Sequence, residues 1–575
     1  MYPQLRWLVI SGSSIVTFAG IDLSAVAQST PPPGVTLPPT TPDTVEQTIP
    51  NPSQSSPPFP EQSSPLPEPS LETPTTPEQP ESTSSSSEPF LVNQVEVLGN
   101  TVLQQEIAQL TKQYENREVT FEELLELRSK ITQLYVENGY VTSGAFLLPV
   151  FLNSGVVKIQ VVEAELEGIE LSGLNRLQEG YVRSRLQLAT TKPLNQQHLE
   201  EALQLLQLNP LLEQVNAELT TGSTPGRNIL LIELQEAPAF HTGVAVDNYR
   251  SPSIGSIQGS LFIAHDNVLG FGDRFDGKYG ITEGLNTFDL NYAIPVNPRD
   301  GILSLGYSNS DSRIIEDDFE DLDIRSESDT FSFNFRQPVL KSPSTEFALS
   351  VGLDVRRSQT FILDNIPFSF SEGPENGESN VTVIRLAQDW FNRSPKRILA
   401  ARSQFSLGVD AFDATINDIG TDGQFFAWLG QFQWVEQLSP RIVLVTGINA
   451  QLTPDSLLPL ERFSMGGIDT VRGYRQNQLV ADNGILGSVE VRIPLSSDPS
   501  YLQLAPFFEV GTAWNKQDSD PDPATIASLG LGLRWRIISD LDLRLDYGIP
   551  LISVNNQGDS LQENGFHFSV RYQPW

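Results

Sequence analysis

The stretch Leu529-Gly530-Leu531-Gly532-Leu533-Arg534-Trp535-Arg536 carries a large apolar side chain at every second position, with glycine or arginine between them. Successive side chains of a β-strand point to opposite faces, so this alternation predicts a strand with one apolar face and one polar face. The same pattern recurs in Leu541–Tyr547, Phe331–Arg336 and Leu303–Ser308. It continues from Ala239 to the end of the chain, and we therefore predict an antiparallel, all-β region over residues 239–575.

The strands of a soluble β-sandwich also alternate between apolar and polar side chains, so alternation alone does not identify a membrane barrel. The number of strands and the lengths of their connections separate the two. We count about sixteen strands, an even number within the range of bacterial outer-membrane barrels. Short turns alternate with long polar loops along the region. The short turns are 297–300, 341–343, 439–440 and 539–540, and the long loops are 313–328, 361–379, 411–423 and 453–483. An inserted barrel lengthens only its outer connections, so we predict a transmembrane β-barrel, with a sandwich or repeat adhesin as the alternative.

The last strand supports closure of the barrel. Phe566, Phe568 and Tyr572 alternate with polar residues, and the chain ends in Trp575 after Pro574, which interrupts the pattern. A barrel in lipid must pair its last strand with its first, because no unpaired backbone edge can face the hydrocarbon. We take these four aromatic residues as a C-terminal barrel signal.

The N-terminus has the features of an export signal. Arg6 precedes an apolar stretch, and Ala25-Val26-Ala27 is a typical cleavage site, so residues 1–27 are predicted to be a signal peptide. Residues 28–89 are rich in Pro, Ser, Thr and Glu and are predicted to be a disordered linker.

Residues 90–164 and 165–238 have the pattern of one α/β module present twice. Each copy opens with an alternating strand that runs into a glycine, Gly99 in the first and Gly173 in the second. In the first copy Thr120 and Glu123 form a capping box before a helix that ends at Asn138-Gly139. In the second copy Leu199, Ala202, Leu203 and Leu206 line one helix face. Each copy closes with a strand, so we predict helices packed on one face of a small mixed sheet.

Composition excludes several functions. The chain has no cysteine and four histidines, and we predict no metal site and no cofactor. Its formal net charge of -35 disfavours nucleic acid as a partner. No P-loop, HExxH or GxSxG motif is present, so we do not expect an enzyme.

One pair of motifs suggests how the barrel works. Val471-Arg472-Gly473-Tyr474 lies in the long loop before the predicted twelfth strand, and Phe507, Glu509 and Gly511 lie on the next strand but one. A guanidinium inside a polar barrel needs a carboxylate, and Glu509 at an inward position could accept bidentate hydrogen bonds from Arg472. The pair could hold the loop until a substrate enters; alternatively, it is a static salt bridge that stiffens the barrel.

In these motifs the chain resembles the two-partner secretion transporters, the haemolysin and filamentous-haemagglutinin secretion proteins of the POTRA-barrel superfamily. That family has a VRGY loop folded into the barrel, an F-x-D-x-G strand motif, two POTRA domains and sixteen strands. The resemblance covers about residues 90–575. This chain departs from it by having Glu509 where the family has Asp, and by a Pro-rich segment where some relatives have a plugging helix.

The resemblance implies an outer-membrane transporter with periplasmic POTRA domains that capture an unfolded exoprotein by β-augmentation and pass it through the barrel. Its expected partners are that exoprotein and outer-membrane lipid, with the barrel monomeric and no nucleic acid bound. The first alternative is an assembly factor that inserts other barrels, although such factors generally carry more POTRA domains. The second is a passive porin, which would leave the two α/β modules unexplained.

Overall fold

The computed structural model describes residues 89–149, 155–363, 365–418, 420–554 and 558–574. The predicted signal peptide and the predicted linker up to residue 88 lie outside these residues. The described chain forms two compact units, which meet in sequence at Ala237 and Pro238.

The first α/β module packs two helices against a three-stranded sheet. Its elements are β1 (Phe90–Val92), β2 (Gln94–Leu98), α2 (Gln104–Thr111), η1 (Lys112–Tyr114), β3 (Arg117–Val119), α3 (Phe121–Glu137), β4 (Gly144–Leu147) and β5 (Val156–Val162). The sheet order is β2-β5-β4, with β2 parallel to β5, while β1 and β3 form a separate pair. The predicted capping box is present, since Thr120 and Glu123 each bond the other's backbone N–H. Helix α3 ends where predicted, before Asn138.

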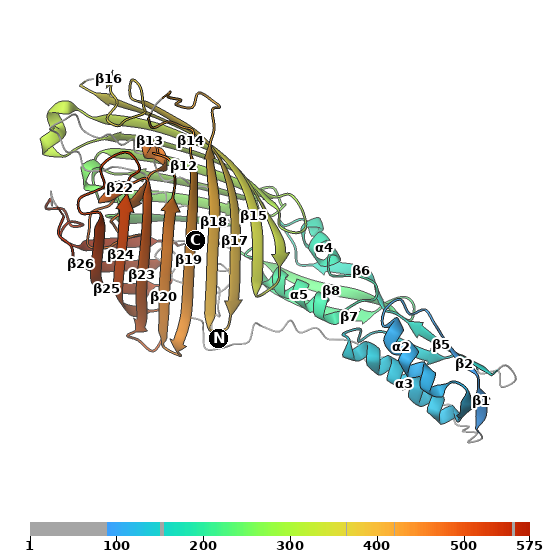
Figure 1. The fold of residues 1–575 in the computed structure, drawn as a ribbon. Coiled ribbons are helices and arrows are strands. Elements are labelled where there is room, and N and C mark those ends of the chain that lie inside the picture. The colour runs from blue at the N-terminus through green and yellow to red at the C-terminus, as the bar shows by residue number, and fades with distance from the viewer. Residues whose placement is uncertain (1–88, 150–154, 364, 419, 555–557, 575) are drawn as a thin grey trace. The chain divides into compact units, whose positions relative to one another are not determined.

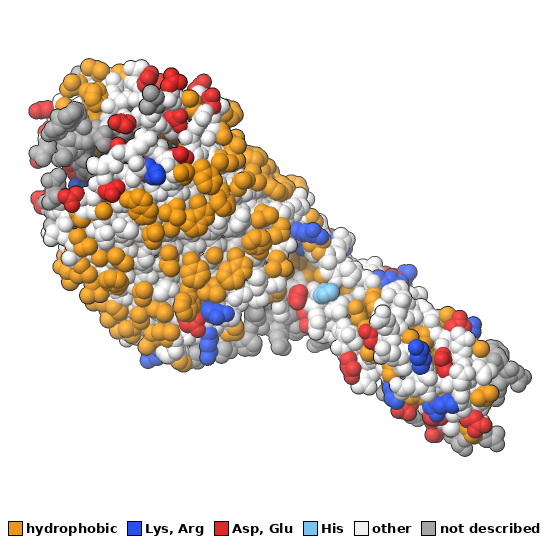
Figure 2. Space-filling view, viewed as in Figure 1, with side chains coloured by type: hydrophobic (Ala, Val, Ile, Leu, Met, Phe, Trp, Pro, Cys, Tyr) orange, Lys and Arg blue, Asp and Glu red, His pale blue; other side chains and the backbone are white. Residues whose placement is uncertain are grey.

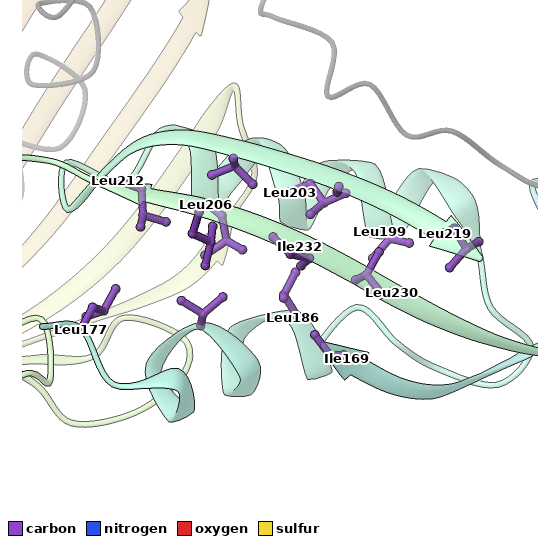
Figure 3. Packing of buried hydrophobic residues seen from close by; sticks show 14 of the residues in the cluster. Ile169, Leu177, Leu186, Leu199, Leu203, Leu206, Leu212, Leu219, Leu230 and Ile232 are labelled. Atoms are coloured by element: carbon purple, nitrogen blue, oxygen red, sulfur yellow. The ribbon is translucent and has the colours of Figure 1, made fainter. Parts of the chain in front are cut away.

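The second module repeats this plan. Its elements are β6 (Glu165–Ser172), α4 (Glu179–Gln187), α5 (Gln196–Gln207), β7 (Leu212–Thr221) and β8 (Arg227–Glu236), in the sheet order β6-β8-β7. Figure 3 shows leucines of helix α5, among them Leu199 and Leu203, lying over Leu230 and Ile232 of the central strand. These four side chains are almost fully buried, so the helix is held by its apolar stripe.

The second unit is a closed antiparallel barrel of sixteen strands among the described residues, which confirms the predicted fold class (Figure 1). The strands are β9 (Phe240–Asp247), β10 (Gln258–Asp266), β11 (Arg274–Ile281), β12 (Leu285–Pro295), β13 (Ile302–Arg313), β14 (Arg325–Lys341), β15 (Thr345–Ile362), β17 (Glu378–Ser394), β18 (Arg397–Gly408), β19 (Phe426–Ser439), β20 (Ile442–Leu452), β23 (Asn483–Pro494), β24 (Leu502–Trp514), β25 (Thr525–Ile538), β26 (Leu541–Pro550) and β27 (Phe566–Tyr572). A two-residue strand, β16 (Ile366–Pro367), adds to one end of β15, which otherwise pairs with β17. Short 3-10 turns, η2 (Pro252–Ile254) and η3 (Asp317–Leu322), lie in its loops. The last strand pairs with the first, Tyr572 opposite Val244, and so closes the barrel.

The apolar face of the barrel points outward. Phe331, Phe333, Leu529 and Leu531 are each about half exposed, at 54%, 45%, 51% and 47%, whereas the alternate positions Thr330 and Ser528 are buried. Figure 2 shows hydrophobic side chains spread over the wall formed by β17–β20, with acidic side chains gathered at the end where β16 lies. A soluble sandwich would place its apolar face inward, so this direction separates the two architectures that alternation alone leaves open.

Strand β14 begins earlier than the sequence indicates. We predict a loop over 313–328; β13 ends at Arg313, where that loop is predicted to start, but β14 already begins at Arg325. The added residues of β14 form polar pairs, such as Glu327 opposite Asp311. Backbone hydrogen bonds continue the ladder beyond the point where the side chains alternate between apolar and polar, so the alternation ends before the strand does.

None of the helices in the described ranges is long and apolar enough to cross a membrane. In the same residues no group of three or more His, Asp or Glu side chains is arranged to hold a metal ion.

Candidate functional site: the interior loop

The connection between β20 and β23, residues 453–482, folds into the barrel and is called the interior loop here. It contains a 3-10 turn, η4 (Pro459–Glu461), and a small hairpin of β21 (Phe463–Met465) with β22 (Leu479–Ala481). Nearly every residue from Ser456 to Asn477 is buried. The tip of the hairpin, residues 466–478, carries Val471–Tyr474, so the predicted motif lies between the eleventh and twelfth barrel strands.

The structure brings Arg472 and Glu509 into contact. The Nε atom of Arg472 donates to Oε1 of Glu509 at 2.8 Å, and the backbone N–H of Arg472 donates to Oε2 at 2.7 Å. The guanidinium carbon lies 3.4 Å from the centre of the Phe507 ring. Arg472 and Glu509 are only 4% and 3% exposed, so the pair is shielded from solvent. The attraction between the two charges is stronger there than in water.

Further charged side chains complete what we call the Arg472 cluster. Nη1 of Arg472 also donates to Glu490 at 2.8 Å and to Asp546 at 2.7 Å. Arg534 bonds the same two carboxylates, Arg544 bonds Asp546, and Arg492 bonds Glu490. Four arginines thus share three carboxylates, in a network that joins the loop to strands β23–β26. Such a network tolerates buried charge because its carboxylates bond several cations between them.

Gly473 and Tyr474 place the backbone of the tip against the wall. Gly473 has a φ of +95°, and a Cβ there would lie 2.8 Å from the backbone carbon of Gly548. The Tyr474 hydroxyl donates to the carbonyl oxygens of Ala527 and Ile552 at 2.9 and 2.8 Å. A side chain larger than hydrogen at position 473 would therefore push the tip off β26.

Val471 and Gly511 act through packing. Val471 is fully buried in an apolar cluster with Phe463, Met465 and Tyr474. A Cβ at Gly511 would lie 2.3 Å from Sδ of Met465, so any larger residue at position 511 would displace this side chain of the hairpin. The three motif positions on β24 thus provide a ring face, a carboxylate and a close backbone approach.

The predicted C-terminal signal lies on β27, apart from the Arg472 cluster. Phe566 and Tyr572 are 52% and 43% exposed on the outer face, and Phe568 is half-buried. Trp575 lies outside the described residues. His567, between these aromatic residues, is buried, and its Nε2 accepts a hydrogen bond from the backbone N–H of Gly473 at 3.2 Å.

Sequence reasoning missed Glu490, Asp546 and the arginines that share them. Each occupies an inward position of an alternating strand, as in Val489-Glu490-Val491-Arg492. The sequence signal that could have found them is a charged residue at an inward position of a strand whose outward positions are apolar.

Comparison with known proteins agrees with this geometry. The family model described as haemolysin secretion/activation protein ShlB/FhaC/HecB matches residues 226–535, and a ShlB-type POTRA domain model matches residues 90–164. The chain is 22% identical over 470 residues to the outer membrane transporter CdiB of Dickeya dadantii (78% of this chain, 81% of that protein). It is 23% identical over 502 residues to the heme/hemopexin transporter protein HuxB of Haemophilus influenzae (82% and 86%).

Among solved structures, CdiB from Escherichia coli is similar in fold, with a TM-score of 0.66, 22% identity, and coverage of 91% of this chain and 96% of that one. The family model spans more than half of this chain. The chain therefore belongs to the ShlB/FhaC/HecB family of haemolysin secretion/activation proteins, and is an outer-membrane β-barrel transporter of secreted proteins whose POTRA region lies in the periplasm.

Proposed function

We propose that this chain captures an unfolded partner protein in the periplasm and secretes it through the barrel, with the interior loop leaving its place during transport. The buried Arg472 cluster is the observation that carries the proposal. A loop that fills the interior must move before a polypeptide can pass. Charged contacts suit a reversible arrangement, because a polar chain that enters can replace them with its own hydrogen bonds.

Capture is supported by the open edges of the periplasmic sheets. In the second module β7 is ten residues long and lies at the edge of the order β6-β8-β7. An extended peptide can add a strand to such an edge through backbone hydrogen bonds, which do not depend on its sequence. This suits a partner that arrives unfolded. Folding of the partner outside the cell would give the transport its direction, since the periplasm holds no ATP.

The closed barrel also supports a monomeric transporter. Each described barrel strand pairs on both sides within one chain, including the closing pair β27 and β9. No strand edge is left in the described barrel for a second copy to extend.

The first experiment is deletion of the gene, followed by proteomics of the medium, the cell surface and the outer membrane. Transport predicts the loss of one large exported protein, with outer-membrane porins unchanged. Reduced porin levels without a lost exported protein would instead support a barrel-assembly factor.

The second experiment tests the motif in the complemented strain. Arg472→Ala is expected to abolish export while the barrel still inserts, as shown by its heat-modifiable migration. Arg397→Ala, which removes an exposed arginine at the start of β18, is the matched control and should export normally. Normal export by both variants would refute the role of Arg472.

A further inference from the structure

A second charged cluster holds the interior loop at a different place. Glu461, at the end of η4, is 5% exposed. Its Oε1 accepts hydrogen bonds from Arg356 of β15 at 2.7 Å and from Arg385 of β17 at 2.9 Å, and its Oε2 accepts two more from Arg385 at 3.2 Å. Arg356 also donates to the backbone oxygen of Leu460 at 2.6 Å. We call these residues the Glu461 cluster.

The two clusters hold the loop to different parts of the barrel wall. Leu457, Leu458 and Leu460, which precede Glu461, pack with Val381 and Val383 of β17 and with side chains near the start of β19. The hairpin that follows packs instead with Leu486, Ala513 and Ile526 of β23–β25. The loop therefore runs between two sides of the interior, with an apolar contact and a charged contact on each.

The charges of the two clusters are opposite in sense. At the tip, the loop supplies a cation that pairs with carboxylates of the wall; before the hairpin, the loop supplies a carboxylate that pairs with arginines of the wall. A loop that slipped to place Arg472 near Arg356 and Arg385 would meet like charges, which is unfavourable. The arrangement thus fixes the direction of the loop as well as its attachment.

We propose that Glu461 is a second positioning residue for transport, which fixes the base of the hairpin so that its tip meets Glu509. Only Arg462 separates Glu461 from the start of β21, so the position of the carboxylate sets where the hairpin begins. Arg462 adds to this by donating to Asp518 at 2.8 Å. This inference rests on the proposed function, in which the interior loop controls passage. It extends control of the loop to Glu461, which lies 11 residues before Arg472 in the sequence.

The test measures the position of the tip without any secreted partner. The chain has no cysteine, so Ile468→Cys places a single reporter thiol at a buried position of the tip. The full-length protein is purified into lipid vesicles, and its rate of reaction with a water-soluble maleimide is measured. Glu461→Gln in this background should raise the rate about tenfold or more, because removing one partner of a buried ion pair favours local opening. Arg472→Ala should raise it as well.

Matched variants separate positioning from general weakening of the barrel. Glu346→Gln removes a carboxylate that pairs with Arg336 and Lys341 of the wall, away from the loop, and should leave the rate unchanged. Glu461→Asp keeps the charge and should label more slowly than Glu461→Gln. All variants should keep heat-modifiable migration.

The inference is overturned if Glu461→Gln labels at the parent rate while Arg472→Ala labels faster. If Glu461→Gln does not assemble, Arg356→Gln removes the contact with Glu461 from the side of the wall. Its labelling rate is then compared with the parent rate and with that of Arg472→Ala in the same way. Because labelling needs no export, its result is independent of the transport proposal. Faster labelling of purified Glu461→Gln, together with a gene deletion that removes no exported protein, would support Glu461 and contradict transport.

Discussion

Glu163 and Glu236 occupy the same place in the two periplasmic modules. Each stands at the end of the last strand of its sheet and accepts backbone N–H groups from the loop after the first strand. Glu163 accepts from Thr101 at 2.6 Å and Val102 at 3.1 Å, and Glu236 accepts from Asn175, Arg176 and Leu177 at 2.7, 2.8 and 2.9 Å. Each loop begins at a glycine with positive φ, Gly99 or Gly173, packed against that last strand. The repeat visible in the sequence thus extends to a buried carboxylate.

These carboxylates predict how acid affects the periplasmic modules. Burial opposes ionisation of Glu163, but the bonds from Thr101, Tyr135 and Val102 outweigh it and hold its pKa below the ordinary value. A lowered folded-state pKa stabilises the module above the unfolded pKa of about 4.3, and this stability is lost as the pH falls through the folded-state pKa. Glu163→Gln should therefore lower the free energy of unfolding by about 1–3 kcal/mol at pH 7. The difference from the parent should shrink below about pH 4.

The measurement is pulse proteolysis of the full-length protein in urea at several pH values. Cleavage within residues 90–237 reports unfolding of the periplasmic modules. Glu236→Gln should behave in the same way, because burial of Glu236 is likewise outweighed by the backbone N–H groups of Leu177, Asn175 and Arg176, and its pKa is lowered. Glu201→Gln, at an exposed position of α5, is the control. A gap between Glu163→Gln and the parent that stays constant down to about pH 3 would contradict this account.

Gly473→Ala should detach the tip of the interior loop. The left-handed conformation costs a non-glycine residue about 1–2 kcal/mol, and the contact with Gly548 adds to that cost. We expect export to be lost while outer-membrane levels of the protein remain normal. Gly487→Ala, on β23, is a suitable control because a Cβ there meets nothing within 4 Å. Equal export by the two variants would show that the close approach at Gly473 is unimportant.

Glu509→Asp tests the departure from the family's motif. Glu509 reaches both the backbone N–H and the guanidinium of Arg472, and a side chain one methylene shorter cannot keep both bonds without a shift of the tip. The variant should label faster than the parent at an Ile468→Cys reporter, but more slowly than Glu509→Gln. Removing the charge leaves part of the buried network unpaired, at a cost of about 3–5 kcal/mol. A rate for Glu509→Asp equal to that of Glu509→Gln would mean that the charge alone does not hold the tip.

Leu531→Arg tests which face of the barrel meets lipid. Leu531 is 47% exposed on the outer face, and an arginine near the middle of the bilayer costs a barrel about 2–4 kcal/mol. The variant should reach the outer membrane in reduced amounts, as measured by fractionation and heat-modifiable migration. Ser332→Arg, on β14 beside Phe331 and Phe333, is the contrasting variant on the inner face. Equal insertion of Leu531→Arg and the parent would argue against an outward apolar face.

The sequence predicted the barrel and the module repeat because both follow from local periodicity, whereas the Arg472–Glu509 contact was expected from the motifs of the family that the chain resembles. Alternation gives the face of every strand residue but not the register between strands. Glu490 lies opposite Phe507, and Asp546 lies opposite Gly532; these pairings bring both carboxylates to Arg472. The Glu461 cluster needs contacts between residues about one hundred positions apart, such as Arg356 and Glu461, which a linear pattern does not contain.

Movement of the interior loop is the central claim, and a reversible cross-link tests it most directly. A Cβ at Gly511 would lie 2.3 Å from Sδ of Met465, so Met465→Cys makes room for Gly511→Cys and brings two thiols together between the hairpin and β24, in a chain that has no other cysteine. In cells that make this double variant, with disulfide formation verified by a thiol-labelling assay, export of the partner protein should stop under oxidising conditions and resume when a reductant is added, while Met465→Cys alone exports under both conditions. Export at the same rate with the disulfide formed and reduced would contradict a loop that must leave the barrel interior.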